Sequence, residues 1–201
     1  MNLTTTNFTD NLKIEKKNYN FVSLKKAQEM LDFNLDQLPF SYKILLENLI
    51  RKIDSTGIQK KDLENVIKQK TGKEILFSPS RVLMQDYTGV PAVADLAAMR
   101  DKVKSQGNDP ETINPVVPVS LVIDHSINVD SYSKKDSLFY NVKKEYERNS
   151  ERYKLLKWAQ GSLKNFLLFP PGSGICHQIN LEFLAQVVQI ENKFLFLDSV
   201  V

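Results

Sequence analysis

The stretch Pro118-Val-Ser-Leu-Val-Ile-Asp-His-Ser126 decides the fold class of this 201-residue chain. Its first six residues are mostly apolar and do not alternate with polar ones, which is typical of a strand buried on both faces of a parallel sheet. Asp124 and His125 follow at the carboxyl end of this predicted strand. Ligands of open α/β sheets bind beyond the carboxyl ends of the strands. The stretch therefore predicts a fold class and the sheet edge at which a site would lie.

Short apolar runs and helical periodicity alternate on both sides of this stretch. We expect a turn at Gly89 and Pro91. The predicted strands are residues 75–77, 81–84, 118–123, 167–169 and 194–197. The predicted helices are residues 92–104, 137–165 and 181–188. This alternation predicts an α/β domain over residues 73–201, with a mostly parallel sheet flanked by helices.

A helical preface is expected before the sheet, over residues 19–72. Ser23 is a candidate N-cap for its first helix, and Gly57 is expected to end its second. The predicted helices of the preface are residues 23–31, 42–56 and 62–70. Residues 1–18 are polar and lack a pattern, so we expect them to form a flexible arm.

The composition indicates an ordinary globular chain with a small net charge. Hydrophobic residues make up 42% and charged residues 25%, and the formal net charge is +3. Lysines are interspersed with acidic residues, which indicates a solvated surface and not a nucleic-acid patch. No apolar run approaches the roughly 20 residues that a membrane span needs, and no secretory signal is recognisable.

Cys176 is the only cysteine of the chain. A lone cysteine cannot form an internal disulfide, and it cannot by itself hold a zinc ion or a thiolate cluster. We therefore expect a reducing compartment and a cytoplasmic protein. Its side chain is expected to serve as a small apolar residue, with a reactive thiol as the alternative.

Three predicted strands deliver polar side chains to one edge of the sheet. Gln85 follows the first, Asp124 and His125 follow the second, and His177 comes after the glycine-rich loop that ends the third. His125 and His177 are the only two histidines of the chain. Position alone therefore predicts a site for a polyanion or polyacid in an α/β domain.

Each of these groups also has a purely structural interpretation. Asp124 could cap the turn at Ser126, Gln85 could satisfy loop amides, and either histidine could be a structural hydrogen-bonding residue. The loop Pro170-Pro-Gly-Ser-Gly174 could be only a tight turn, although its glycines also let backbone amides approach an anion. The functional interpretation is favoured because both histidines and this loop fall at the same edge.

Longer motifs resemble a known family. The stretch Arg81-Val-Leu-Met-Gln-Asp-Tyr-Thr-Gly-Val-Pro-Ala-Val-Ala-Asp-Leu-Ala-Ala-Met-Arg100 closely resembles the first signature of the aconitases, in the branch of bacterial aconitase A and the cytosolic iron-regulatory proteins. Further motifs follow in the family's order: Asn114-Pro-Val-Val-Pro, Leu121-Val-Ile-Asp-His-Ser126, Glu147-Arg-Asn-Ser-Glu-Arg-Tyr153 and Pro170-Pro-Gly-Ser-Gly-Ile-Cys-His-Gln-Ile-Asn-Leu-Glu182. The resemblance extends from about residue 19 to the end of the chain.

The resemblance implies the dehydration of citrate to cis-aconitate and its rehydration to isocitrate, a step of the tricarboxylic acid cycle. In that family a [4Fe-4S] cluster, with one iron free of protein ligands, acts as the Lewis acid. Gln85 resembles the residue that binds a substrate carboxylate. The candidate catalytic residues are Asp124 and His125, which resemble the pair that handles the departing and returning hydroxyl, and His177, which resembles a second active-site histidine.

The sequence also departs from the family pattern. The motif Gly-Thr-Asp-Ser-His-Thr would follow residues 198–201, and the chain stops before it. The family's cluster cysteines, substrate-binding arginines and serine base lie further along and are absent here, and Cys176 does not stand at a cluster-ligand position. Leu197 stands where the family usually has proline. We therefore expect an N-terminal fragment, truncated within the first α/β subdomain, that binds no cluster and is inactive alone.

Three functions are compatible with this expectation. The chain is one piece of an aconitate hydratase, with citrate and isocitrate as ligands and a complementary C-terminal chain as a possible partner. Alternatively, it is an inactive truncated remnant without catalysis. The third alternative is a piece that binds RNA as iron-regulatory proteins do, which the small net charge does not support.

Overall fold

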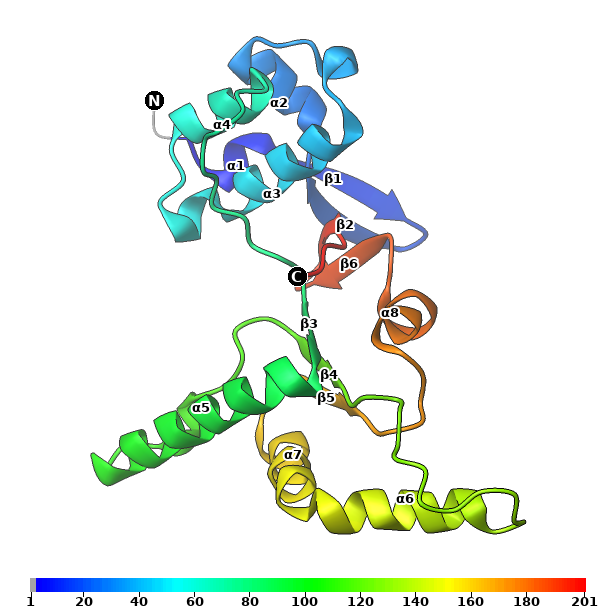
Figure 1. Cartoon of the computed structure of the whole chain (residues 1–201). Helices are drawn as coiled ribbons and strands as arrows, with labels where there is room; N and C mark the ends of the chain where they lie inside the picture. The colour runs from blue at the N-terminus through cyan, green and yellow to red at the C-terminus, as the bar shows by residue number, and fades with distance from the viewer. Residues whose placement is uncertain (1–2) are drawn as a thin grey trace. The chain divides into compact units, whose positions relative to one another are not determined.

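The computed structural model describes residues 3–201, which fall into two compact units. The first unit contains the residues up to Ser80 together with Gln186–Ser199. The second contains Arg81–Ala185 together with Val200–Val201. Figure 1 labels most of the helices and strands of both units.

The second unit is built on a parallel sheet of three strands in the order β3-β4-β5. These strands are β3 (Val82–Gln85), β4 (Val119–Val122) and β5 (Phe166–Phe169). The central strand β4 is buried at all four residues, as its mostly apolar run without alternation predicts. The predicted α/β fold with a parallel sheet flanked by helices is confirmed.

Two long helices cover the hydrophobic core of this sheet. They are α5 (Asp86–Ser105) and α7 (Ser150–Ser162). Val93 of α5 and Leu156 of α7 join Leu121 of β4 in one buried cluster. Burial of each such side chain contributes about 1.5–3 kcal/mol, so this cluster fixes the helices against the sheet.

The single helix expected over residues 137–165 is in fact two helices. Helix α6 (Ser137–Arg148) ends at Asn149, and α7 begins at the next residue. Asn149 has φ −108° and ψ 27°, outside the helical conformation, so the chain changes direction there. A short 3-10 helix, Pro110–Thr112, lies in the connection between α5 and β4.

The turn predicted at Gly89 and Pro91 is wrong, because both residues lie inside α5. A Cβ atom at Gly89 would lie 2.5 Å from Leu121 Cδ1, so glycine allows the first turns of α5 to approach β4 closely. Pro91 removes one backbone donor, whose partner would be the carbonyl of Tyr87. Tyr87 is exposed, so water can satisfy the freed carbonyl and the helix continues.

The helix predicted over residues 181–188 is wrong for its second half, residues 185–188. Helix α8 (Cys176–Ile179) passes into a single π-helical turn at Asn180–Leu184, and residues 188–191 form strand β6 (Val188–Glu191) of the first unit. β6 pairs antiparallel with β7 (Phe194–Leu197). The connecting residues Asn192 and Lys193 both have positive φ, as tight hairpin turns require.

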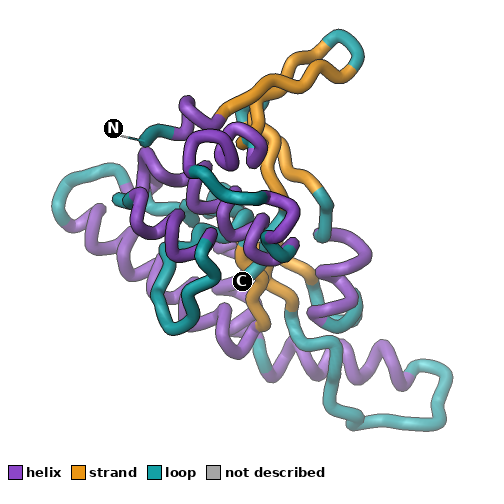
Figure 2. The backbone as a smooth tube through the Cα atoms, turned by 90° about the horizontal axis from the view of Figure 1, so that it is seen from above, coloured by secondary structure: helices purple, strands orange, loops and turns teal. Residues whose placement is uncertain are grey.

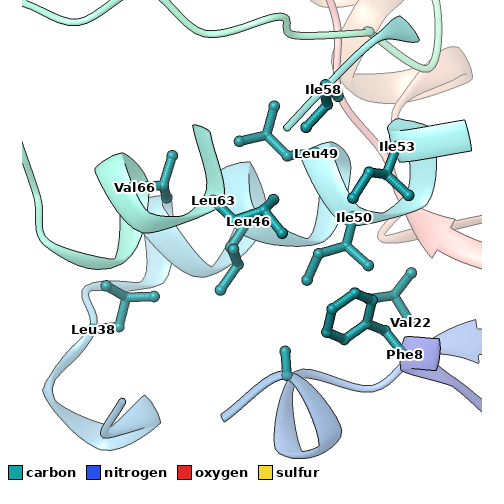
Figure 3. Packing of buried hydrophobic residues seen from close by; sticks show 11 residues of the cluster. Phe8, Val22, Leu38, Leu46, Leu49, Ile50, Ile53, Ile58, Leu63 and Val66 are labelled. Atoms are coloured by element: carbon teal, nitrogen blue, oxygen red, sulfur yellow. The ribbon is translucent and has the colours of Figure 1, made fainter. Parts of the chain in front are cut away.

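The first unit contains the predicted helical preface. Its helices are α1 (Thr5–Phe8), α2 (Leu24–Leu31), α3 (Phe40–Thr56) and α4 (Lys60–Ile67), with a 3-10 turn at Leu35–Gln37. The Ser23 side chain accepts a hydrogen bond from the backbone of Lys26, and Gly57 ends α3 with φ 72°. Both local predictions are confirmed. Figure 3 shows the core of this unit, in which Phe8 and Val22 lie next to Ile50 of α3.

A mixed sheet of four strands, in the order β1-β2-β7-β6, completes the first unit. The arm expected over residues 1–18 is therefore wrong for its described part, since β1 (Thr9–Ile14) and β2 (Lys17–Val22) form an antiparallel hairpin. Met1 and Asn2 lie outside the described residues. Phe8 anchors the segment because its side chain is fully buried. The hairpin extends away from the helices of its unit (Figure 2).

Two strand predictions for the α/β domain are also corrected. Residues 194–197 form a strand, but it pairs in parallel with β2 and not with the three-stranded sheet. Residues 75–77 form no strand. They belong to a segment that Asn48 of α3 holds by two hydrogen bonds to the backbone of Ser78. Hydrogen bonds with this side chain take the place of backbone pairing with a neighbouring strand.

Candidate active site

The carboxyl ends of the three parallel strands are aligned by their register. Gln85, the last residue of β3, is paired with Val122 of β4, which is paired with Phe169 of β5. A surface cavity of about 480 Å³ lies at this edge. Its polar lining comes from the four predicted site residues, Gln85, Asp124, His125 and His177, together with Asp86, Tyr87, Cys176 and Asn180. The structure thus brings all four predicted residues to one cavity.

Asp124 and His125 form a close pair just beyond β4. The Asp124 Oδ1 atom lies 3.5 Å from His125 Nδ1. The same oxygen accepts hydrogen bonds from the backbone N–H of Ser126 at 2.8 Å and from its hydroxyl at 2.7 Å. These two donors are the main reason that the pKa of Asp124 is lowered, with His125 and Arg152 adding to it. Asp124 therefore caps the turn and also stands beside the imidazole as a carboxylate.

His177 reaches the cavity from α8, after the glycine-rich loop. Gly172 and Gly174 have φ values of 81° and 136°, which favour glycine because a Cβ atom is strained there. The Asn180 side chain accepts a hydrogen bond from Arg81 Nη1 at 2.6 Å, which ties the end of α8 to the start of β3. The loop therefore makes a tight turn that directs α8 back to the sheet edge.

Cys176 also lines the cavity, but its thiol is not activated. Burial raises the pKa of the Cys176 thiol, and a neutral thiol is a poor nucleophile. The side chain is half-buried. These observations support the expectation of a small apolar residue over the alternative of a reactive thiol.

Asp86 has a role that sequence reasoning missed. Its carboxylate is 1% exposed and accepts from Arg152 Nη1 at 2.8 Å. The two residues are 66 positions apart, so no local pattern joins them. The one available signal is that Arg152 belongs to the motif 147–153.

The residues of this chain do not by themselves fit a [4Fe-4S] cluster. Such a cluster is held by several cysteine thiolates, and the sequence contains one cysteine. Within residues 3–201, no group of three His, Cys, Asp or Glu side chains gathers as a metal site would require. A single thiol can supply at most one ligand to such a cluster.

Comparison with known proteins decides the family. The sequence profile of the aconitase family (aconitate hydratase) matches residues 53–198. The chain belongs to the aconitase family. It is 48% identical over 194 residues to aconitate hydratase A of Rickettsia conorii and 44% identical over 196 residues to that of Streptococcus mutans. The predicted resemblance is thereby confirmed.

The chain spans only about a fifth of the length of these aconitase relatives. Each of the two alignments covers 96% of this chain and 22% of the relative. For aconitate hydratase A of Thermus thermophilus, the identity is 48% over 173 residues, which are 85% of this chain and 19% of the relative. No helix within residues 3–201 combines the length and the apolar character that crossing a lipid bilayer requires.

Proposed function

We propose that this aconitase-family chain is the N-terminal part of an aconitate hydratase that interconverts citrate and isocitrate through cis-aconitate. The observation that carries the proposal is the gathering of Gln85, Asp124, His125 and His177 around one cavity at the carboxyl edge of the sheet. An amide, a carboxylate and two imidazoles suit a substrate with several carboxylates and one hydroxyl. The names of the relatives support this choice of reaction.

The proposed chemistry of this chain concerns the hydroxyl group of the substrate. The Gln85 side-chain amide donates a hydrogen bond to a substrate carboxylate. A protonated His125 donates its proton to the departing hydroxyl, which leaves as water, and takes a proton back from water in the reverse direction. The neighbouring Asp124 carboxylate is ionised at neutral pH, since its ordinary pKa of 3.8 is lowered further by the hydrogen bonds from Ser126. It lies 3.5 Å from His125 Nδ1, where it faces the charge of the proton-donating imidazole.

The remaining parts of the reaction are assigned to segments outside this chain. Dehydration also removes a carbon-bound proton, and we assign that base and the cluster ligands to the other four-fifths of an aconitate hydratase. The isolated chain is therefore proposed to be inactive, with a complementary C-terminal segment as its partner. We assign it to the cytoplasm, because a single cysteine suits a reducing compartment.

Reconstitution tests the proposal. The 201-residue chain is co-expressed with the part of the R. conorii enzyme that it does not match, and the absorbance of cis-aconitate is followed after addition of citrate or isocitrate. We expect turnover with both pieces and none with either alone. In the reconstituted enzyme, His125→Asn lowers kcat by about 10²- to 10⁴-fold.

The control for this experiment is His125→Asn in the isolated chain, whose unfolding transition should match that of the unchanged chain because His125 is exposed. A well-folded pair of pieces without turnover would overturn the proposal and favour an inactive remnant. Turnover by the isolated chain would instead contradict the assigned division of the active site.

A further inference from the structure

A cluster of charged side chains borders the candidate active site without belonging to its assigned residues. Arg152 donates from Nη1 to Asp86 Oδ2 at 2.8 Å and from Nη2 to Glu145 Oε1 at 3.1 Å. Asp86 and Glu145 are both buried. Since these residues come from α5, α6 and α7, one guanidinium joins three helices.

Glu145 is fixed in place by further donors. Its Oε1 atom also accepts from the Tyr153 hydroxyl at 3.0 Å and from Asn149 Nδ2 at 2.9 Å. The guanidinium is a planar group that can bind two acceptors at once. Because Glu145 holds the Nη2 group of Arg152, the Nη1 group is oriented toward Asp86.

Asp86 connects this cluster to the cavity. It is the first residue of α5 and directly follows Gln85, the last residue of β3. Its carboxylate lies at a helix N-terminus, where negative charge is favoured. Asp86 itself lines the cavity, so a restraint on its side chain is also a restraint on the backbone that carries Gln85.

We propose that Arg152 is a positioning residue of the candidate active site, which acts through Asp86 to fix the end of β3 where Gln85 lies. The inference rests on the proposed function only for the role of Gln85 in substrate binding. The charge of Arg152 also contributes, as the smallest of the favourable influences, to the lowered pKa of Asp124. Arg152 thus acts next to the ends of two of the three strands, β3 and β4.

Two variants separate charge from geometry. Arg152→Lys keeps a positive charge but reaches only one acceptor at a time, whereas Arg152→Met removes both functions. Arg148→Met is the matched control, because Arg148 pairs with Asp130 in an exposed ion pair outside the cavity. It removes the same charge and a comparable ion pair from the neighbouring helix.

The first measurement uses the 201-residue chain and requires no activity. Amide NMR signals of Gln85 and Asp86 are compared between the unchanged chain and the variants. We expect them to shift or broaden in Arg152→Lys, with larger changes in Arg152→Met, and to stay unchanged in Arg148→Met. Undisturbed Gln85 and Asp86 signals in a folded Arg152→Lys chain would overturn the inference.

The second measurement uses the reconstituted enzyme and distinguishes positioning from stabilisation. Misplacement of Gln85 by Arg152→Lys should raise KM for citrate about tenfold, while kcat changes by less than about threefold. A purely structural role would instead lower the active fraction, and hence kcat, at an unchanged KM, and that result would overturn the inference. If the unchanged pieces show no turnover, the proposed function fails and the NMR result alone decides the role of Arg152.

Discussion

Gly89 occupies the first turns of α5, at a point where the helix meets the central strand. A Cβ atom there would lie 2.5 Å from Leu121 Cδ1 and 3.1 Å from Met84 Cβ. Leu121 is fully buried, so it has little space into which to move. Glycine is thus required at position 89 by the close contact between helix and sheet and not by a turn.

The Gly89→Ala variant is therefore expected to be destabilised. Overpacking lowers the free energy of unfolding by about 1–3 kcal/mol, although alanine is the better helix former by about 1 kcal/mol. Urea unfolding followed by circular dichroism measures the change. Gly161→Ala is the control, because nothing lies within 4 Å of its Cβ position in α7, and it should be neutral or stabilising. Equal effects of the two variants would contradict the packing argument.

Asp124 has a lowered pKa, which makes the stability of the second unit depend on acidity. The ordinary pKa is 3.8, and the hydrogen bonds from Ser126 favour the ionised form in the folded state. The stabilisation is therefore present above about pH 4 and is lost as the pH falls through the lowered pKa of the folded state. Asp124→Asn should lose stability at neutral pH and show less further loss on acidification than the unchanged chain.

NMR titration of the Asp124 carboxyl carbon checks the cause. In Ser126→Ala the hydroxyl donor at 2.7 Å is lost and the backbone donor at 2.8 Å remains. The pKa of Asp124 should then rise from its value in the unchanged chain, yet stay below 3.8. No change on removal of the hydroxyl would show that Ser126 does not lower this pKa through its side chain.

The contact between α6 and α7 includes a hydrogen bond from the Tyr153 hydroxyl to the Glu145 carboxylate. Burial, and then the hydrogen bond to Glu145, raise the pKa of Tyr153 from 10.0 to about 12. The folded state therefore keeps Tyr153 neutral at pH values where the unfolded chain ionises it. This contribution to stability is complete below pH 10.0 and is lost as the pH rises to about 12.

Tyr153→Phe should remove that part of the alkaline sensitivity. The free energy of unfolding, measured with urea between about pH 9 and 12, should fall less steeply with pH in the variant than in the unchanged chain. Its stability at neutral pH should be lower, because the hydrogen bond at 3.0 Å to Glu145 is gone. Tyr132→Phe, which alters an exposed tyrosine, serves as the control and should leave the pH profile unchanged.

The elements that could be predicted from the sequence are those with local signals. The Ser23 cap and the positive φ of Gly57 set the bounds of α2 and α3, and the apolar run 118–123 identified β4. Gln85, Asp124, His125 and His177 could be predicted because each stands at the end of a strand, just beyond one, or after the glycine-rich loop.

The elements that were missed depend on partners distant in the sequence. Strand β7 pairs with β2, which lies more than 170 residues earlier, and no pattern within either strand specifies this. The ion pair of Asp86 and Arg152 joins two motifs 66 residues apart. The hairpin β1–β2 was missed because polar residues interrupt both strands. The side chains that anchor it, Phe8 and Val22, are buried against residues of α3 that lie further along the chain.

At the scale of the whole molecule, each of the two units has a hydrophobic core of its own. Leu46 belongs to the core of the first unit and Leu121 to that of the second, and both side chains are fully buried. Replacing a buried leucine by alanine lowers stability by about 2–5 kcal/mol. The matched variants Leu46→Ala and Leu121→Ala therefore place the same cavity in different cores.

Amide hydrogen exchange should show which of the two units each variant destabilises. Leu46→Ala should lower the protection of amides in α3 more than in β4, and Leu121→Ala should do the opposite. We expect this difference because each core can unfold while the other stays folded. Equal loss of protection in α3 and β4 with either variant would show a single cooperative unit instead.

The sheet of the first unit has a consequence for biosynthesis, because β6 and β7 are translated after the whole of residues 81–185. A ribosome that adds about 5–20 residues per second needs roughly 5 to 20 s to translate that intervening segment. During this time the N-terminal helices and the β1–β2 hairpin exist without their parallel neighbour, and the edge of β2 is unpaired. The nascent first unit is thus an incomplete domain for seconds, which makes it the part of this chain that a chaperone would have the longest opportunity to bind.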